Sequence, residues 1–216
     1  MSDPYSVVRD FERALCEYTG APYAVTTTSC TMALLLAVAW YLRDDTNAGL
    51  ADGYGPMQRQ RPQIEIPKRT YVGVPMSIIH AGGYPSFRDQ DWIGAYPLEP
   101  TAIWDCARRF RGGMYVPRQV QCLSFHHTKI LGISTHGGAI LHDDWEMGAW
   151  LRRARFDGRT EAVPPTKDRF AHLGWHCYMT PPTAAEGLLR LAGLPWHNAD
   201  LPNSDYPDLS KLELFN

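Results

Sequence analysis

The sequence of 216 residues lacks any strong charge bias, any cysteine-rich pattern and any long apolar run. Its 21 Lys and Arg residues nearly balance 23 Asp and Glu residues, and the net charge of −2 implies no general attraction to nucleic acid or to a membrane. Nucleic acid is therefore not an expected partner, although the charge alone does not exclude it. The five cysteines are dispersed without a Cys-x-x-Cys pair, which argues against a disulfide framework and favours a reducing compartment.

Targeting signals and common catalytic motifs are also missing. The first residues do not have the layout of a secretory leader, and the longest apolar run is too short to span a bilayer. The chain contains no G-x-G-x-x-G, G-x-x-x-x-G-K-[ST], H-E-x-x-H or G-x-S-x-G motif. His172 and His176 have the spacing of two metal ligands on a helix, but Gly174 lies between them and no third ligand is evident. We expect a soluble, cytoplasmic protein without a metal site.

Arginine is concentrated in two places. The clusters are Arg108, Arg109, Arg111 and Arg118, and Arg152, Arg153, Arg155 and Arg159. Such clusters indicate either solvated faces or the rim of a site for an anion such as a diphosphate.

The hydrophobic pattern alternates between strands and helices. It predicts helices over 4–19, 28–41, 75–81, 143–155 and 183–191, strands over 23–27, 63–68, 84–88, 102–105, 120–125 and 138–142, and a loop over 46–62. This order predicts one three-layer α/β/α domain with a mostly parallel sheet over residues 1–194, and an extended tail over 195–216.

Two of the predicted strands lead into polar residues that suit an anion or a ring. Hydroxyl side chains over 26–31 precede a buried helix, whose free N–H groups can hold a phosphate or can simply be capped. Asp105 ends an apolar strand, at the sheet edge where ligands of parallel α/β proteins bind. Its carboxylate can hold a protonated ring nitrogen or cap the next turn.

Lys129 and Tyr71 also follow strands. A lysine desolvated at such a place becomes nucleophilic and can form a Schiff base, although it can equally be a surface lysine. Tyr71 can stack on a flat ring or pack in the core. Taken together, a lysine, an acid, a phosphate cradle and an aromatic ring are the groups that bind pyridoxal 5′-phosphate.

The order of these segments resembles the DegT/StrS-type sugar aminotransferases, which are fold-type-I pyridoxal phosphate enzymes. FERALCEYTGAPYAVTTTSCTMALLL resembles their opening helix, strand and S-G-T-x-A-L turn, and IPKRTYVGVP resembles P-x-x-T-[FY]-x-A-T. IWDCA resembles I-E-D-A-A, and SFHHTKILGISTHGG resembles S-F-[HY]-P-T-K followed by G-E-G-G. The resemblance covers most of residues 7–192 in a shortened frame, as in a truncated large domain. It implies that a strand–helix unit is missing between 89 and 101, and that the C-terminal small domain is missing too.

The resemblance assigns roles to residues of this chain. Lys129 takes the place of the Schiff-base lysine, and Asp105 that of the partner of the pyridine nitrogen. The implied cofactor-binding residues are Ser29, Cys30, Thr31, Tyr71, Asp105, Arg108, Ser124, Lys129 and His176. Three of them differ from the family's usual residue. Cys30 replaces a glycine, and Arg108 replaces a glutamine that lies near the cofactor's phenolic oxygen. His176 replaces an asparagine that reaches the cofactor phosphate of the partner subunit.

The function implied is that of a homodimeric aminotransferase with active sites at the subunit interface. It would move an amino group from an amino acid, by resemblance glutamate, to a keto-sugar, by resemblance nucleotide-linked. Related dehydratases have histidine in place of the lysine, and the presence of Lys129 therefore favours amino transfer. Two alternatives stay open. One is another pyridoxal phosphate reaction, decarboxylation or elimination, on a different amine-bearing substrate, including one in nucleotide or nucleic-acid modification. The other is a cofactor-binding or scaffold protein without turnover.

Overall fold

The computed structural model describes residues 3–51, 62–170, 172–203 and 205–215. Its strands are β1 (Tyr23–Thr27), β2 (Gln63–Pro67), β3 (Tyr84–Arg88), β4 (Tyr96–Pro97), β5 (Ile103–Asp105), β6 (Val120–Ser124) and β7 (Gly138–His142). Its helices are α1 (Ser6–Thr19), α2 (Cys30–Ala51), α3 (Gly73–His80), α4 (Trp145–Ala154) and α5 (Pro181–Ala192). Short 3₁₀ helices cover Pro165–Lys167, Leu209–Lys211 and Glu213–Phe215. No helix in these ranges is both long and apolar enough to cross a membrane.

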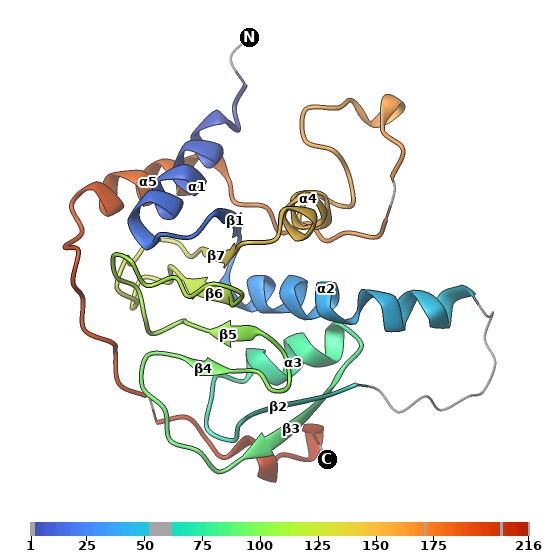
Figure 1. The fold of residues 1–216 in the computed structure, drawn as a ribbon, viewed down its shortest axis with the longest axis vertical. Coiled ribbons are helices and arrows are strands. Elements are labelled where there is room, and N and C mark those ends of the chain that lie inside the picture. The colour runs from blue at the N-terminus through green and yellow to red at the C-terminus, as the bar shows by residue number, and fades with distance from the viewer. Residues whose placement is uncertain (1–2, 52–61, 171, 204, 216) are drawn as a thin grey trace.

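The strands are arranged in the order β1-β7-β6-β5-β4, with β2 and β3 as a neighbouring pair (Figure 1). A bridge between Glu65 of β2 and Glu99, just after β4, joins the two groups. β7 is antiparallel to β1 and β6, and β4 is antiparallel to β5 and, through the bridge, to β2. The other five described strands run in one direction, as predicted, but only β2–β3 and β5–β6 are parallel neighbours, and the sheet is therefore mixed.

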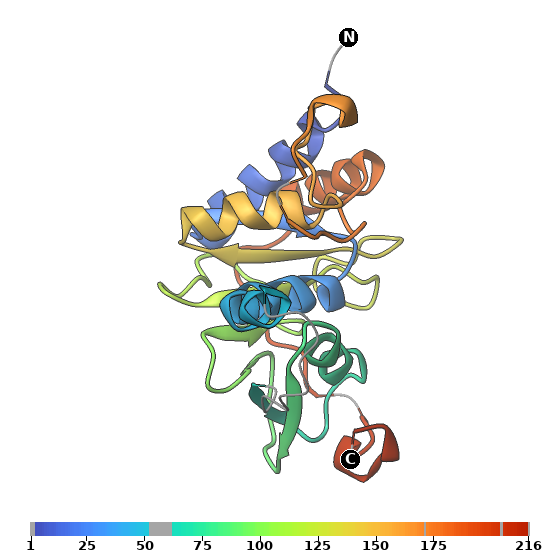
Figure 2. The same ribbon diagram turned by 90° about the vertical axis from the view of Figure 1, so that its right-hand side faces the viewer.

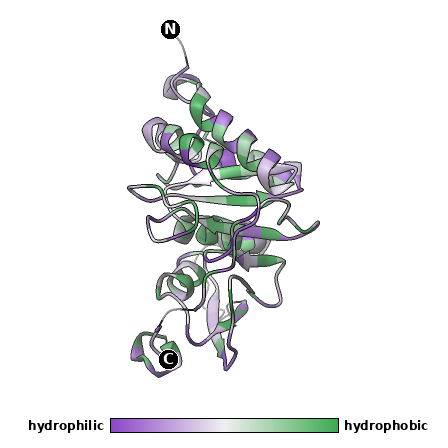
Figure 3. Ribbon diagram, turned by 90° about the vertical axis from the view of Figure 1, so that its left-hand side faces the viewer, coloured by the Kyte–Doolittle hydropathy of each residue, from purple (hydrophilic) through white to green (hydrophobic). Residues whose placement is uncertain are grey.

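Helices cover both faces of the sheet, because successive strand residues point to opposite sides. Val25, Cys122 and Ile140 belong to a core shared with α2, α3 and α4, whereas their neighbours Ala24 and Leu123 belong to a second core with α1 and α5. α1 and α5 lie side by side in both views (Figures 1 and 2). Hydrophilic and hydrophobic residues alternate along the outer helices, as expected where only one face packs on the sheet (Figure 3). The predicted three-layer architecture is confirmed.

The central helix α2 is longer than the pattern predicts. As expected of a helix that is apolar nearly all round, its residues from Ala33 to Val38 are buried. It continues to Ala51 instead of ending at Tyr41, and the prediction of a loop is therefore wrong for residues 46–51. Polar residues such as Asp, Thr and Asn lower helix propensity by only a few tenths of a kcal/mol, and no proline interrupts the segment. The remainder of the predicted loop, 52–61, lies outside the described residues.

Strand β4 is a feature that the sequence pattern did not predict. It is two residues long and contains Pro97, and it therefore shows no period-2 pattern. It lies in the segment 89–101, where the resemblance implies a missing strand–helix unit. The short strand fills this place in the sheet by pairing Tyr96 with Asp105 and Pro97 with Trp104.

The segment after Pro195 is largely extended, and it is attached to the domain. The Leu201 N–H donates to the Arg108 carbonyl at 2.9 Å, and the Leu209 N–H donates to the Lys68 carbonyl at 2.9 Å. Leu209 and Phe215 are buried, the latter against Phe87. The two 3₁₀ helices at 209–211 and 213–215 were not predicted.

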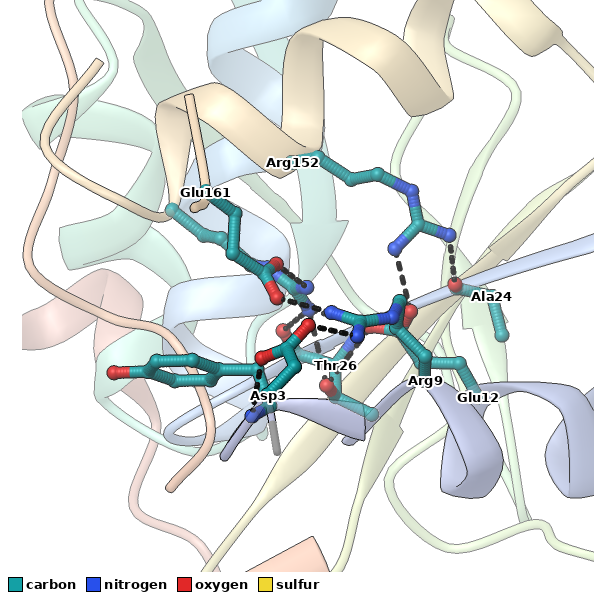
Figure 4. A network of polar contacts seen from close by, with 9 residues as sticks. Asp3, Arg9, Glu12, Ala24, Thr26, Arg152 and Glu161 are labelled. Carbon is teal, nitrogen blue, oxygen red and sulfur yellow. Dashed lines mark hydrogen bonds and ion pairs between the residues drawn. The ribbon is translucent and has the colours of Figure 1, made fainter. Parts of the chain in front are cut away.

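A buried ion pair ties α1 to α4 and β1. The Glu12 carboxylate accepts hydrogen bonds from Arg155 and Arg152, and from the backbone and hydroxyl of Thr26 at 2.9 and 3.0 Å (Figure 4). Arg155 is 2% exposed and also donates to the Thr26 carbonyl. Burial by itself would raise the pKa of Glu12, but Arg155 and Arg152 outweigh it and hold the pKa below its ordinary value.

The arginine clusters therefore serve mainly as connections within the chain. Besides the two arginines on Glu12, Arg109 and Arg111 pair with Asp200 at 2.6 and 3.5 Å. The interpretation as a solvated face is wrong for the buried Arg155, whereas the side chains of Arg111 and Arg152 stay 42% and 40% exposed. Intramolecular carboxylates hold all four of these arginines.

We expect Glu12→Ala to lower the free energy of unfolding by about 3–5 kcal/mol, because it leaves the charge of Arg155 buried without its partner. Asp10→Ala, on the exposed side of α1, removes only a surface pair with Arg13. It should change the free energy of unfolding by less than about 1 kcal/mol. Urea unfolding of both variants measures the difference. Equal losses in the two variants would contradict the assigned role of Glu12.

Candidate functional site

A cavity of about 450 Å³ opens beyond the carboxyl ends of β5 and β6, next to the start of α2. Its lining comes from four separate parts of the chain. The lining residues are Ser29, Cys30, Thr31, Leu34, Tyr71, Val74, Asp105, Ala107, Ser124, His126, Thr128, Lys129, His136 and Gly137. This is the edge of the sheet where parallel α/β proteins bind ligands.

The start of α2 forms one wall of the cavity. The Ser29 hydroxyl accepts from the Met32 N–H at 3.2 Å, and the Ser29 carbonyl accepts from the Ala33 N–H. A helix start presents N–H groups and the positive end of the helix dipole, which together favour an anion. Cys30 is not among the described non-glycine residues with positive φ, so its turn does not require the glycine of the family pattern.

Gly138 brings strand β7 against this turn. A Cβ atom at Gly138 would lie 2.4 Å from the Ser29 carbonyl carbon and 2.5 Å from the Cys30 nitrogen. Gly138 also pairs with Thr27 of β1 and with Ser124 of β6. Since only glycine fits here, the close approach sets Ser124 beside the start of α2.

Asp105 lies at the inner end of the cavity and is 4% exposed. Its Oδ2 atom accepts from the Tyr96 hydroxyl at 2.8 Å, and its Oδ1 atom accepts from the Ala107 N–H at 2.8 Å. Burial raises the pKa of Asp105, while these two hydrogen bonds and the charge of Lys129 oppose the rise. The carboxyl group is thus desolvated and fixed in orientation, and it borders an open space.

Lys129 enters the same cavity from the loop between β6 and β7. The loop is closed by backbone hydrogen bonds from Phe125 to Gly137 and from Ile133 to Phe125, both 2.8 Å. Burial and the nearby charge of Arg108 lower the pKa of Lys129, while Asp105 acts in the opposite direction. A larger fraction of the amine is therefore neutral than in a surface lysine, as a nucleophile requires.

Tyr71 stands at the mouth of the cavity and is 54% exposed, so it is not a core residue. A Cβ atom at Gly73 would lie 2.7 Å from the Tyr71 ring and 3.0 Å from the Thr31 hydroxyl. The absence of a side chain at Gly73 thus allows the ring to lie close to the start of α2, with one face available to a flat ligand.

Three polar lining residues were not selected from the sequence, although the motif SFHHTKILGISTHGG contains them all. His126 and Thr128 share a hydrogen bond of 2.9 Å between Nδ1 and Oγ1, and His136 lies across the same loop. Burial, His127 and Lys129 lower the pKa of His126. The feature of the sequence that could have identified these three lining residues is the number of histidines around one lysine. The sequence pattern alone does not show which of those histidines line the cavity.

Two of the predicted site residues do not line the cavity. The Arg108 guanidinium donates to the Pro202 carbonyl at 2.6 Å and lies over the Tyr206 ring. His176 is at the surface, where its Nδ1 atom lies 2.8 Å from the Asp157 carboxylate. His172 contacts the Leu173 carbonyl and stacks on Trp150. Within the ranges that the structure describes, no three His, Cys, Asp or Glu side chains are placed to hold a metal ion.

Comparison with known proteins identifies the family that the sequence resembles. Residues 1–103 match the model of the DegT/DnrJ/EryC1/StrS aminotransferase family. Among curated proteins, none matches the sequence. The family model thus confirms the resemblance over residues 1–103, and the motifs around Asp105 and Lys129 follow after this match.

Solved structures share the fold at low sequence identity. The sugar aminotransferase CalS13 from Micromonospora echinospora is 19% identical with a TM-score of 0.70, and the match covers 87% of this chain and 60% of that one. A DegT DnrJ EryC1 StrS aminotransferase from Brucella abortus is 21% identical with a TM-score of 0.64, covering 87% and 58%. NtdA from Bacillus subtilis, solved with the bound cofactor PMP, is 18% identical with a TM-score of 0.62, covering 86% and 47%. The chain therefore spans about three fifths or less of the length of these three proteins.

Gly138→Ala should destabilise the protein by about 1–3 kcal/mol, because the added methyl group overlaps the Ser29–Cys30 peptide. Gly193→Ala is the matched control: its backbone is right-handed and its new Cβ atom would meet nothing nearer than 3.9 Å. We expect that control to be neutral or slightly stabilising. Thermal or urea unfolding of the two variants decides, and a neutral Gly138→Ala would mean that β7 does not pack against the turn as described.

Proposed function

We propose that this chain, whose first 103 residues match the DegT/DnrJ/EryC1/StrS aminotransferase family, binds pyridoxal 5′-phosphate in the cavity and transfers amino groups. One observation carries the proposal. A half-buried lysine with a lowered pKa and a buried carboxylate open onto the same cavity as the start of a helix. These are the three groups that hold the aldehyde, the ring nitrogen and the phosphate of this cofactor.

The residues present fit the cofactor at each of its ends. The N–H groups at the start of α2, with the hydroxyls of Ser29, Thr31 and Ser124, would hold the phosphate. The glycine at 138 keeps this cradle free of a side chain. Lys129 would attach covalently through its amine, and Tyr71 would cover one face of the ring. The cofactor would supply an electron sink for the bond-breaking step.

The chain's own groups would then handle the charge and the protons. Asp105 provides the negative charge that favours a protonated ring nitrogen, and that positive partner in turn favours the ionised carboxylate. Lys129, once released from the cofactor, would move a proton to and from the substrate carbon as a general acid and base. Its lowered pKa suits this role near neutral pH.

We propose an amino acid, glutamate in particular, as the donor and a keto-sugar, nucleotide-linked, as the acceptor. The support is the family match and the fold shared with CalS13, whose printed name is sugar aminotransferase. His126 and His136 line the cavity with ring nitrogens that can donate hydrogen bonds, and both substrates would carry anionic groups that accept them. Arg108, where the family has a glutamine, is turned toward the tail and does not bring a new group into the cavity.

We further propose a homodimer that works in the cytoplasm. His176 does not reach the cavity of its own chain, and Asp157 orients its exposed ring, which suits a contact with the partner's cofactor phosphate. All five cysteines are free thiols, in keeping with a reducing compartment.

The function is tested by adding pyridoxal phosphate to the protein and reducing the mixture with borohydride. We expect a visible absorption band before reduction, and afterwards a covalent adduct on Lys129 alone among the four lysines of the chain. Lys129→Ala should abolish both, whereas Lys167→Ala, at an exposed position, should change neither. Adding glutamate before reduction should bleach the band to that of the pyridoxamine form. No band in the wild type would refute cofactor binding, and a band that glutamate leaves intact would favour the other pyridoxal phosphate reactions.

The dimer is tested by sedimentation at micromolar concentration. We expect a species of about twice the chain mass of 24.4 kDa. If His176 serves the partner's site, His176→Ala should weaken cofactor binding by about tenfold, because it removes one hydrogen bond to a charged phosphate. A monomer that binds the cofactor tightly would rule out this role.

A further inference from the structure

We propose that Tyr96 is a positioning residue for the cofactor, acting through Asp105. Its hydroxyl group fixes the Asp105 carboxylate in the orientation that pairs with the protonated ring nitrogen. This inference rests on the proposed function, since it concerns the same cavity. Tyr96 does not line the cavity and was not selected from the sequence.

The register of the sheet brings the two side chains together. Tyr96 and Asp105 are directly opposite each other in the antiparallel β4–β5 ladder, and residues paired in this way project from the same face. The Tyr96 hydroxyl donates to Asp105 Oδ2 at 2.8 Å, and the Ala107 N–H donates to Oδ1 at 2.8 Å. Each carboxylate oxygen thus has a fixed donor, and the group cannot rotate without breaking one of them.

A second hydroxyl group holds the first in place. Thr70 Oγ1 lies 2.5 Å from the Tyr96 hydroxyl oxygen. Tyr96 has one hydroxyl hydrogen, and this hydrogen points at Asp105, so Thr70 is the donor in the second bond. The result is a directed chain from Thr70 through Tyr96 to Asp105. Thr70 directly precedes Tyr71 in the sequence. The hydrogen-bond chain is therefore linked through the backbone to Tyr71, at the mouth of the cavity.

The phenol is held in a dry aromatic setting. Tyr96 is 1% exposed, and the ring of Trp92 packs on it with centroids 4.7 Å apart. The indole N–H of Trp92 donates to the Arg69 carbonyl at 3.0 Å, which anchors the segment before β4. In such surroundings a hydrogen bond to a carboxylate is stronger than in water, and the carboxylate has no water to replace a lost donor.

The consequence for the cofactor follows from the charge of Asp105. Burial favours the neutral carboxyl group, and a neutral group cannot stabilise a protonated ring nitrogen. The hydrogen bond from the Tyr96 hydroxyl lowers the pKa of Asp105 and so favours the ionised carboxylate. Loss of the hydroxyl should therefore weaken the interaction at the ring nitrogen and leave the contacts of the phosphate and of Lys129 unchanged.

The test combines two proteins with two ligands. Wild type and Tyr96→Phe are titrated with pyridoxal phosphate and with its deaza analogue, in which C–H replaces the ring nitrogen and the aldehyde and phosphate are kept. We expect Tyr96→Phe to bind pyridoxal phosphate at least about tenfold more weakly, as for a lost hydrogen bond to a charged group, and the analogue equally well. Tyr115→Phe, which removes a hydroxyl bonded to the Gln119 carbonyl, is the matched control and should change neither affinity.

The outcomes separate this inference from the proposed function. A wild type that binds neither ligand refutes cofactor binding itself, and the role of Tyr96 with it. A wild type that binds, with Tyr96→Phe weakened equally toward both ligands or toward neither, overturns the positioning role alone. If circular dichroism shows that Tyr96→Phe is unfolded, Thr70→Val takes its place, because it removes the donor that orients the Tyr96 hydroxyl. The same selective loss for pyridoxal phosphate is then expected, and its absence overturns the inference.

Discussion

The candidate site depends on the close approach of Gly138 to the peptide between Ser29 and Cys30. Gly138 pairs with Thr27 on one side and with Ser124 on the other, so one residue joins β1, β6 and β7 where the first helix of the cavity begins. There is no room for a side chain between β7 and the turn. The loop that carries Lys129 starts from β6 and returns to β7, and its position therefore follows from the same contact.

Burial makes this arrangement chemically useful. Asp105 and Lys129 are partly or fully desolvated, which raises the pKa of the acid and lowers that of the amine. Both shifts are opposed. The Tyr96 hydroxyl and the Ala107 N–H favour the ionised Asp105 carboxylate, and the charge of Asp105 raises the pKa of Lys129. The site thus holds two groups of adjustable charge in a fixed geometry. At the β1 edge of the sheet, the Glu12–Arg155 pair ties α1, on one face, to β1 and to the end of α4, on the other face.

Much of the fold could be predicted from the sequence, because regular apolar periods determine regular elements. Strand 23–27 and strand 138–142 have the predicted bounds, and seven of the nine predicted cofactor-binding residues line the cavity. Strand β4 could not be predicted: it is too short for a periodic pattern, and its place is decided by pairing with β5 and with Glu65. The partners of the arginines were equally out of reach, since Glu12 and Arg155 are 143 residues apart in the chain.

The most direct test of the account is a crystal structure of the protein soaked with pyridoxal phosphate. We predict density continuous from the Lys129 amine to the cofactor, the ring nitrogen within hydrogen-bond distance of Asp105, and the phosphate at the start of α2 beside Ser29. Density for the cofactor at another lysine, or a ring turned so that its nitrogen faces away from Asp105, would contradict the account.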